Sequence, residues 1–302
     1  DVYKRQGYYG KNYYFDNIGK MTNKGVELSA VWNDLRANWG YSINGSVSFN
    51  RNKIDYMAEV APAYSYNAQT GRPYGTLIGL VADGFYDVDD FNADGSLKAD
   101  LPQPMFGAVQ PGDIKYRDLD RSGFVDQNDV TKVGKSPYPE WTYSLGAAFN
   151  YRGFDFSFLL QGIAGASFNL LDNAVQTRAF VDNGNVYPIA RGAWAYYPEQ
   201  GIDTRATATY PRLSLQDNSN NYRNSTLWKR SGDFLKLRNV ELGYTFAQPS
   251  LSKAGISKIR IYLSGVNLLT VSRLMRDYDI DPEILSGHPA LKSYNLGLTV
   301  TF

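Results

Sequence analysis

The last ten residues, 293–302, alternate strictly between apolar and polar side chains and end on an aromatic residue. The apolar members fall on one face of an extended strand: Tyr294, Leu296, Leu298, Val300 and Phe302. Successive side chains of a strand point to opposite faces, so this strand requires hydrocarbon on one side and water on the other. A half-buried strand of a soluble sheet and a strand of an outer-membrane barrel both meet that requirement.

Six further segments show the same period of two, and an eighth, weaker one lies at 8–14. The six lie near 23–33, 38–50, 141–151, 154–168, 233–246 and 258–269. In 38–50 the face opposite the apolar one holds only Asn, Ser and Gly, and in 141–151 aromatic residues stand at both ends with aliphatic ones between them. Two interfacial girdles around an apolar band impose that order. Strands of a soluble sandwich are usually shorter and richer in Lys and Glu, so the pattern favours the membrane.

The connections between these segments are alternately short and long. Long excursions cover 53–138, 169–232 and 270–291, and short links join the other neighbours. Outer-membrane barrels have short periplasmic turns and long external loops, so a periplasmic Phe302 places every long excursion outside. We predict an all-β, antiparallel transmembrane β-barrel with about eight spanning strands of a larger barrel and long extracellular loops. The apolar stretch 74–86 then belongs to the external excursion 53–138.

Composition narrows the possible functions. The net charge is +1, which argues against a nucleic-acid patch, and no window of eighteen apolar residues predicts a transmembrane helix. Cysteine is absent and His288 is the single histidine, so thiol chemistry, histidine triads and multi-histidine zinc sites are disfavoured. Rows of Ser, Asn and Gly offer no activated nucleophile. We therefore expect neither an enzyme nor an organic cofactor.

An acid-rich stretch, 118–129, follows the ligand spacing of a twelve-residue calcium loop. The ligand positions hold Asp118, Asp120, Ser122, Phe124 (through its carbonyl), Asp126 and Asp129. Gly123 permits the sharp turn, and carboxylates so close together repel one another without a counter-ion. The serine and the final aspartate depart from the usual pattern, and an acidic loop stabilised by Asx-turns is the alternative. We predict a weakly bound, structural Ca²⁺ ion.

Trp194, Tyr196 and Tyr197 cluster in the excursion 169–232 and are the candidates for substrate contact. Exposed rings of this kind stack on sugars or on peptide side chains. Loop aromatics more often pack against neighbouring loops, so both interpretations stay open.

Several motifs, taken in order, resemble the C-terminal part of a SusC/RagA-type TonB-dependent outer-membrane transporter. They are NIGKMTNKGVEL at 17–28, GDIKYRDLD at 112–120, GFVD at 123–126, GKSPYPEW at 134–141, SGDFLKLRNVELGY at 231–244, VNL at 266–268 and the terminal strand. The resemblance runs over the chain from about residue 7.

This resemblance implies a barrel of about 22 strands with a lumen plug, in the outer membrane of a Gram-negative, Bacteroidetes-like cell. It also implies two partners, a SusD-type surface lipoprotein that captures glycans or peptides and a TonB-type energy transducer. The motifs of a plug and a TonB box are not found in this sequence, so we expect 1–302 to be the C-terminal part of such a barrel. Outer-membrane lipid is then a further partner, and nucleic acid is not.

Two other functions remain open from the sequence. Eight strands can close on their own, which would give a small structural or passive barrel. A soluble, calcium-stabilised carbohydrate-binding β-domain is the second alternative. The coding sequence upstream of residue 1 separates the first from an importer, and membrane fractionation separates the second.

Overall fold

The computed structural model describes residues 18–36, 38–173, 177–247 and 255–302. These residues form two compact units. The first, called here the sheet unit, comprises 24–51, 139–166 and 232–302, and the second, the loop unit, comprises 18–23, 52–138 and 167–231, without the undescribed positions. The strand predicted at 8–14 lies outside the described residues. No helix in the described ranges has the length and apolar character needed to cross a membrane.

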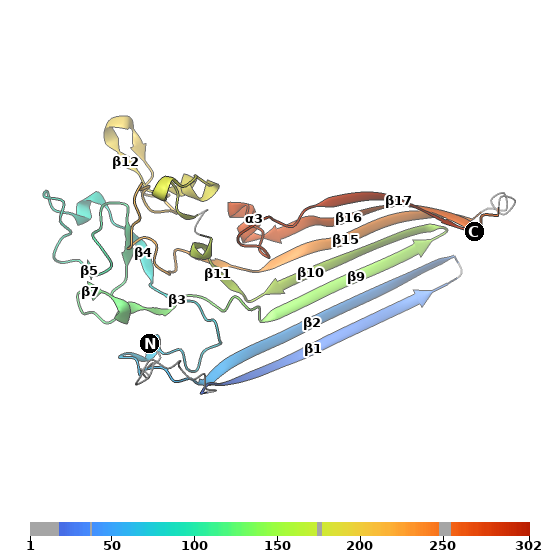
Figure 1. Ribbon diagram of the computed structural model, residues 1–302, viewed down its shortest axis with the longest axis horizontal. Coiled ribbons are helices and arrows are strands. Elements are labelled where there is room, and N and C mark those ends of the chain that lie inside the picture. Colours follow the sequence, from blue (N-terminus) through green and yellow to red (C-terminus); the bar gives the residue numbers. More distant parts are fainter. Residues whose placement is uncertain (1–17, 37, 174–176, 248–254) are drawn as a thin grey trace, which may run out of the picture. The chain divides into compact units, whose positions relative to one another are not determined.

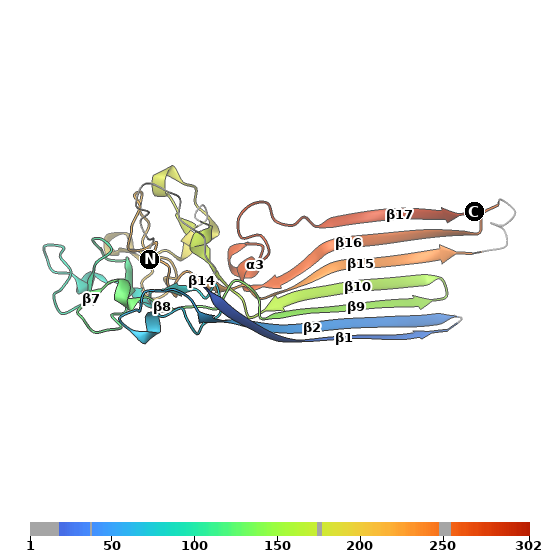
Figure 2. The same cartoon turned by 60° about the horizontal axis from the view of Figure 1, so that its bottom comes forward.

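The sheet unit is built on a seven-stranded antiparallel sheet in the order β1-β2-β9-β10-β15-β16-β17 (Figures 1 and 2). Its strands are β1 (Lys20–Leu35), β2 (Trp39–Tyr56), β9 (Trp141–Tyr151), β10 (Phe154–Ala164), β15 (Phe234–Phe246), β16 (Lys258–Ser272) and β17 (Ser293–Thr301). All seven strongly alternating segments are therefore confirmed as strands of one sheet. The ends of β1, β9 and β15 and the starts of β2, β10 and β16 lie together at one end of the sheet, where β17 also ends and the C-terminus lies (Figure 1).

The register carries the apolar face unbroken from strand to strand. One cross-strand row holds Tyr41, Phe149, Phe156, Leu242, Leu263 and Leu296. The row behind it, on the opposite face, holds Ser42, Ala148, Ser157, Glu241, Ser264 and Asn295. Paired residues of neighbouring strands share a face, so one side of the sheet is apolar and the other polar. The apolar side is open: Leu263 is 55% exposed and Leu296 79%.

Two local features of the sheet depart from simple alternation. A β-bulge shifts the register between Leu237 and Asn239, so Leu237 stays on the apolar face although parity alone would turn it away. The predicted strand 154–168 ends early, at Ala164, which corrects its boundary. Gly165 takes φ +81° there and its N–H donates to Oδ1 of Asp233 at 2.8 Å, which ends the ladder.

The loop unit consists of short strands and 3₁₀ helices. The strands pair as β3 (Ile78–Gly79) with β8 (Thr131–Lys132), β4 (Ala82–Phe85) with β6 (Ile114–Tyr116), β5 (Gln103–Pro104) with β7 (Phe124–Val125), β11 (Ser167–Asn169) with β14 (Lys229–Ser231), and β12 (Tyr196–Tyr197) with β13 (Ile202–Asp203). The 3₁₀ helices are η1 (Ser65–Asn67), η2 (Val88–Asp90), η3 (Gln127–Asp129), η4 (Leu170–Asp172), η5 (Val181–Asn183), η6 (Pro188–Gly192) and η7 (Pro198–Gln200). The apolar stretch 74–86 forms β3 and β4 and adds no strand to the large sheet.

Two excursions that are separate in the sequence share the core of the loop unit. Ile114, from the first excursion, donates its N–H to Asn221 Oδ1 at 2.8 Å, and Asn220 Nδ2 donates to the Ile114 carbonyl at 2.9 Å. Tyr210 and Trp228, from the second, are each 1% exposed and meet edge to face with ring centroids 5.7 Å apart. Buried amide side chains thus replace a continuous sheet in joining 52–138 to 167–231.

Candidate functional site

The structure brings three of the predicted calcium ligands together. Carboxylate oxygens of Asp118, Asp120 and Asp129 all lie within 4.8 Å of one another. The first two follow β6, and Asp129 ends η3, so the chain between them must fold back sharply. Gly123 makes that turn with φ +84°, a backbone conformation that suits glycine.

Backbone N–H groups of the same loop orient these carboxylates. Gly123 N donates to Asp118 Oδ2 at 2.8 Å, and Ser122 N donates to Asp120 Oδ1 at 3.0 Å. Asp129 accepts from Leu119 N at 2.6 Å through Oδ1 and from the N–H of residue 126 at 2.8 Å through Oδ2. These bonds satisfy the carboxylates only in part, because each oxygen has lone pairs to spare for a cation.

The carboxylates of the cluster differ in their electrostatic surroundings. Asp129 is fully buried, and that burial raises the pKa of its carboxyl although three backbone N–H donors oppose the shift. Asp120 is more open, and its hydrogen bond with Ser122 lowers the pKa of its carboxyl. Hard oxygen donors in this number fit Ca²⁺ better than a transition metal. A divalent cation held by the three carboxylates would neutralise their mutual repulsion.

The other three predicted ligands make hydrogen bonds of their own within the loop. Asp126 turns its carboxylate to Asn128, whose N–H donates at 2.6 Å, and it is not one of the three converging residues. Ser122 Oγ donates to the Phe124 carbonyl at 3.2 Å, so this hydroxyl and this carbonyl satisfy each other. Asp126 caps η3 here, so its side chain has a second local role beside the predicted one.

Two tyrosines beside the acidic trio were missed by the sequence analysis. A hydrogen bond with Asp120 raises the pKa of Tyr64, and burial raises the pKa of Tyr66, with the nearby aspartates adding to the effect. Their rings stack with centroids 5.2 Å apart. Both lie in or next to η1, more than fifty residues before the acidic loop, and no local motif links the two segments.

The three candidate substrate residues differ in exposure. The Trp194 side chain is buried, with 9% of its surface exposed, so it has no open ring face to offer a ligand. Tyr196 lies under Arg205, whose guanidinium carbon is 3.8 Å from the ring centroid. Tyr197 alone keeps an exposed ring, at 51%.

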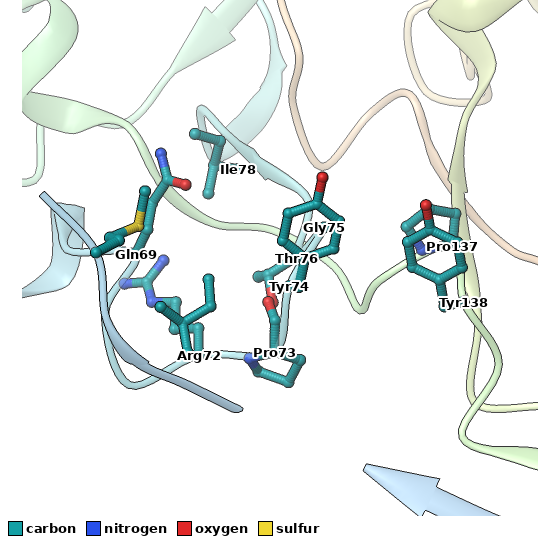
Figure 3. A pocket seen from close by; sticks show the side chains of 11 residues that line it. Gln69, Arg72, Pro73, Tyr74, Gly75, Thr76, Ile78, Pro137 and Tyr138 are labelled. Atoms are coloured by element: carbon teal, nitrogen blue, oxygen red, sulfur yellow. The ribbon is translucent and has the colours of Figure 1, made fainter. Parts of the chain in front are cut away.

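A cavity of about 320 Å³ opens within the loop unit (Figure 3). Arg72 and Gln69 lie on one side of it and Tyr138 on the other, with Tyr74 between them. The rings of Tyr74 and Tyr138 are more than half exposed and lie with centroids 6.2 Å apart, 23° from parallel. Sequence reasoning missed this pair because the two tyrosines come from opposite ends of the first excursion.

Charged groups on the sheet unit's polar face form two clusters. Arg260 donates from Nε to Asp155 Oδ2 at 3.0 Å and from Nη2 to Glu241 Oε1 at 2.6 Å. Lys236 is 1% exposed, and its Nζ donates to Asp281 Oδ1 at 2.8 Å and to Glu283 Oε2 at 2.7 Å.

The second of these clusters fixes the last long loop to the strands. That loop begins with α3 (Arg273–Tyr278), whose Leu274 is fully buried. Glu283 is also bound by Arg238, which lies at the β-bulge. The hydrogen bond from Arg238 has the largest effect on the pKa of Glu283, and Lys236 adds to it; together they lower this pKa to about 2. The carboxylate is therefore ionised at neutral pH.

Comparisons with known proteins relate this one-sided sheet and its long loops to one class of protein, the TonB-dependent receptors. No protein-family model matches the chain. TonB-dependent receptor P3 of Formosa agariphila is 24% identical over 330 aligned positions that cover 98% of this chain, and TonB-dependent receptor P26 of the same organism is 26% identical over 321, covering 97%. The chain spans 30% of the length of each receptor. The resemblance to this class is thereby confirmed.

Among solved structures, the chain is similar to those of the RagAB peptide transporter. One structure aligns with a TM-score of 0.64 and 19% identity, and covers 97% of this chain and 31% of its own. The transporter in its closed-closed state aligns with a TM-score of 0.63 and 21% identity. These matches confirm the predicted fold, an antiparallel barrel sheet that is partial in this chain, since the seven described strands do not close on themselves.

Proposed function

We propose that this chain forms barrel wall and external loops of a TonB-dependent nutrient importer in the outer membrane of a Gram-negative, Bacteroidetes-like cell. The observation that carries the proposal is the apolar face that the register continues without a break through β2, β9, β10, β15, β16 and β17. Its exposed side chains include Leu242, Leu263 and Leu298, each more than half exposed. Leaving one such side chain in water costs about 1.5–3 kcal/mol relative to burying it, so a whole face of them calls for lipid.

The polar face then lines the lumen, and the excursions 53–138 and 169–232 lie outside the cell. Peptides or oligosaccharides are the proposed substrates, because the RagAB structures to which the chain is similar are of a peptide transporter. A SusD-type surface lipoprotein is the proposed partner for capture, and a TonB-type protein the proposed energy source. The protein's role is transport rather than catalysis, because the polar face presents Ser, Asn and Gly rows with ion-paired charges and no activated nucleophile.

Membrane fractionation tests the central claim. The protein is expected in the outer-membrane fraction, extractable only with detergent, and with a gel mobility that changes on boiling. Recovery as a soluble monomer without detergent would support the carbohydrate-binding alternative instead. Uptake of fluorescent peptides and oligosaccharides by cells, with and without the TonB-type protein, separates an importer from a passive barrel.

A structural calcium ion is the second part of the proposal. It is supported by the convergence of Asp118, Asp120 and Asp129 on one point, with their carboxylates held by backbone N–H donors. The ion would tie β6, β7 and η3 into one rigid loop. Affinity would be of the weak, extracellular kind, with Kd about 10⁻⁴–10⁻³ M.

Protease resistance of residues 85–138 tests the calcium site. Replacing Asp118, Asp120 and Asp129 with Ala should remove the protection that calcium gives to this loop in the parent protein. A matched variant, Asp89→Ala with Asp100→Ala, removes exposed carboxylates of the same unit and should keep that protection. If the parent itself cleaves equally with calcium and with chelator, the site is not a calcium site.

A further inference from the structure

Two arginines lie in the short links of the sheet, next to aromatic residues that end the strands. Arg36 follows β1 and donates its N–H to the Trp39 carbonyl at 2.8 Å, and Arg152 follows β9 and donates its N–H to the carbonyl of Asn38 at 3.0 Å. Trp39 and Tyr151 are register partners, so the two links are neighbours. We call Arg36, Trp39, Tyr151 and Arg152 the basic rim.

Each guanidinium of the basic rim lies over one of its rings. The Arg36 guanidinium carbon is 4.9 Å from the Trp39 ring centroid, and that of Arg152 is 5.3 Å from the Tyr151 centroid. A cation over an aromatic face is attracted by the ring quadrupole, which holds the charged end near the ring. The long apolar stems of both arginines cover part of the aromatic surface.

The rings of the basic rim belong to the apolar face. Their cross-strand row continues through Phe154, Tyr244, Ile261 and Leu298. The arginines therefore stand where the apolar face ends and the short links begin. In a barrel this is the level of the lipid headgroups, at which aromatic girdles and long cationic side chains are found.

The charge of the basic rim is only partly compensated. Arg36 pairs with Asp34 through two hydrogen bonds of 3.2 Å, but the arginine side chain is 63% exposed and such pairs are weak. Arg152 makes no ion pair with a carboxylate anywhere in the part of the chain that the structure describes. The rim thus carries an excess positive charge with N–H donors open to solvent.

We propose that the basic rim binds the phosphate of an anionic phospholipid headgroup in the periplasmic leaflet, an inference that rests on the proposed function. A guanidinium presents a planar fork of donors that matches two phosphate oxygens, and both arginines line one pocket together with Trp39 and Tyr151. The rings beneath them pack against the glycerol and the first acyl carbons. An anionic headgroup supplies the charge that the rim lacks, whereas a zwitterionic one carries its own cation.

Native mass spectrometry of the full protein that carries this chain, released from detergent micelles, tests this site. The probes are dimyristoylphosphatidylglycerol and dimyristoylphosphatidylcholine. Replacing Arg36 and Arg152 with Gln should weaken binding of the first phosphatidylglycerol about fivefold for each arginine and leave phosphatidylcholine unchanged. Lysine at both positions should give an intermediate affinity, because the charge stays and the fork is lost. Asp34→Asn should strengthen phosphatidylglycerol binding, because it frees the Arg36 fork.

The control variant replaces Arg191 and Arg223, two arginines of the loop unit, with Gln. Arg223 is a fair match because its guanidinium carbon also lies over a ring, 4.3 Å from the Phe106 centroid. Heat-modifiable gel mobility confirms that each variant is folded. If folded rim variants bind phosphatidylglycerol as tightly as this control does, the inference is wrong and the importer proposal stands. A protein that does not enter vesicles at all overturns the importer proposal itself.

Discussion

Leu263 and Ser264 are neighbours in β16 that face opposite sides of the sheet. Replacing each of them with lysine tests which solvent contacts that side. Leu263 is 55% exposed, and its register partners are Leu242 and Leu296. The partners of Ser264 are Glu241 and Asn295. Both positions lie near the middle of the fifteen-residue strand, so neither lysine can easily reach the end of the sheet.

The two lysine substitutions are expected to differ in their free-energy cost mainly because the two sides of the sheet contact different solvents. A lysine facing lipid near the bilayer midplane costs about 2–4 kcal/mol, and Leu263→Lys also removes an apolar side chain from the face. Ser264→Lys puts the same charge beside a carboxylate and in water, where a surface pair is worth about 0–1 kcal/mol. The difference corresponds to a factor of about 30 to 1,000 in a folding equilibrium, at about 1.4 kcal/mol for each tenfold step.

The assay is the folded fraction after refolding into phosphatidylcholine vesicles, read from heat-modifiable gel mobility over a urea series. Leu263→Lys should move the midpoint to markedly lower urea, and Ser264→Lys should leave it near that of the parent. Equal midpoints for the two variants would refute the assignment of lipid to the apolar face. A larger loss for Ser264→Lys would reverse the two sides.

Two further predictions concern the last long loop. Lys236→Met leaves a buried carboxylate without its cation, at a cost of about 3–5 kcal/mol. Amide exchange in the loop should therefore accelerate at least a hundredfold. The control Arg276→Gln changes an exposed arginine and should alter the exchange rate less than about fivefold. The pKa of Glu283 is lowered to about 2, so its contribution is present above the unfolded-state pKa near 4.5 and is lost as pH falls toward 2. Protection of the loop amides, measured against the intrinsic exchange rate at each pH, should fall over that range in the parent, and Glu283→Gln should flatten the profile. A parent whose protection does not change with pH would contradict the assigned ion pairs.

The strands were predictable because the reason for their alternation is local. Each strand has its own apolar and polar faces, so each can be recognised from its own sequence alone, whatever strand it pairs with. The bulge at Arg238 was not predictable, because it depends on how two strands pair. The same holds for the end of β10, where Gly165 N–H donates to Asp233, a residue far along the chain that directly precedes β15.

The same distinction between local and non-local causes applies to the candidate sites. Asp118 and Asp120 meet Asp129 because a dozen residues suffice to wrap the chain around one point, so spacing in the sequence predicts spacing in space. The spacing does not reveal that the Asp126 side chain also caps η3, a second local role of the same residue. The burial of Trp194 was not predictable from the local sequence, since whether a loop aromatic is exposed depends on what folds over it.

The distribution of charge over the sheet favours lipid over a covering protein layer as the partner of the apolar face. From β2 at Trp39–Phe49 through β9, β10, β15, β16 and β17, the apolar face carries no charged residue, and the charges of the basic rim sit only where it ends. The opposite face carries Arg260 with two carboxylates in mid-sheet. A second protein sheet packed on this face would also exclude charged residues. It would not, however, require the apolar band to end at the same level on every strand. An uncharged band bounded by rings and cations is what a slab of hydrocarbon with polar surfaces requires.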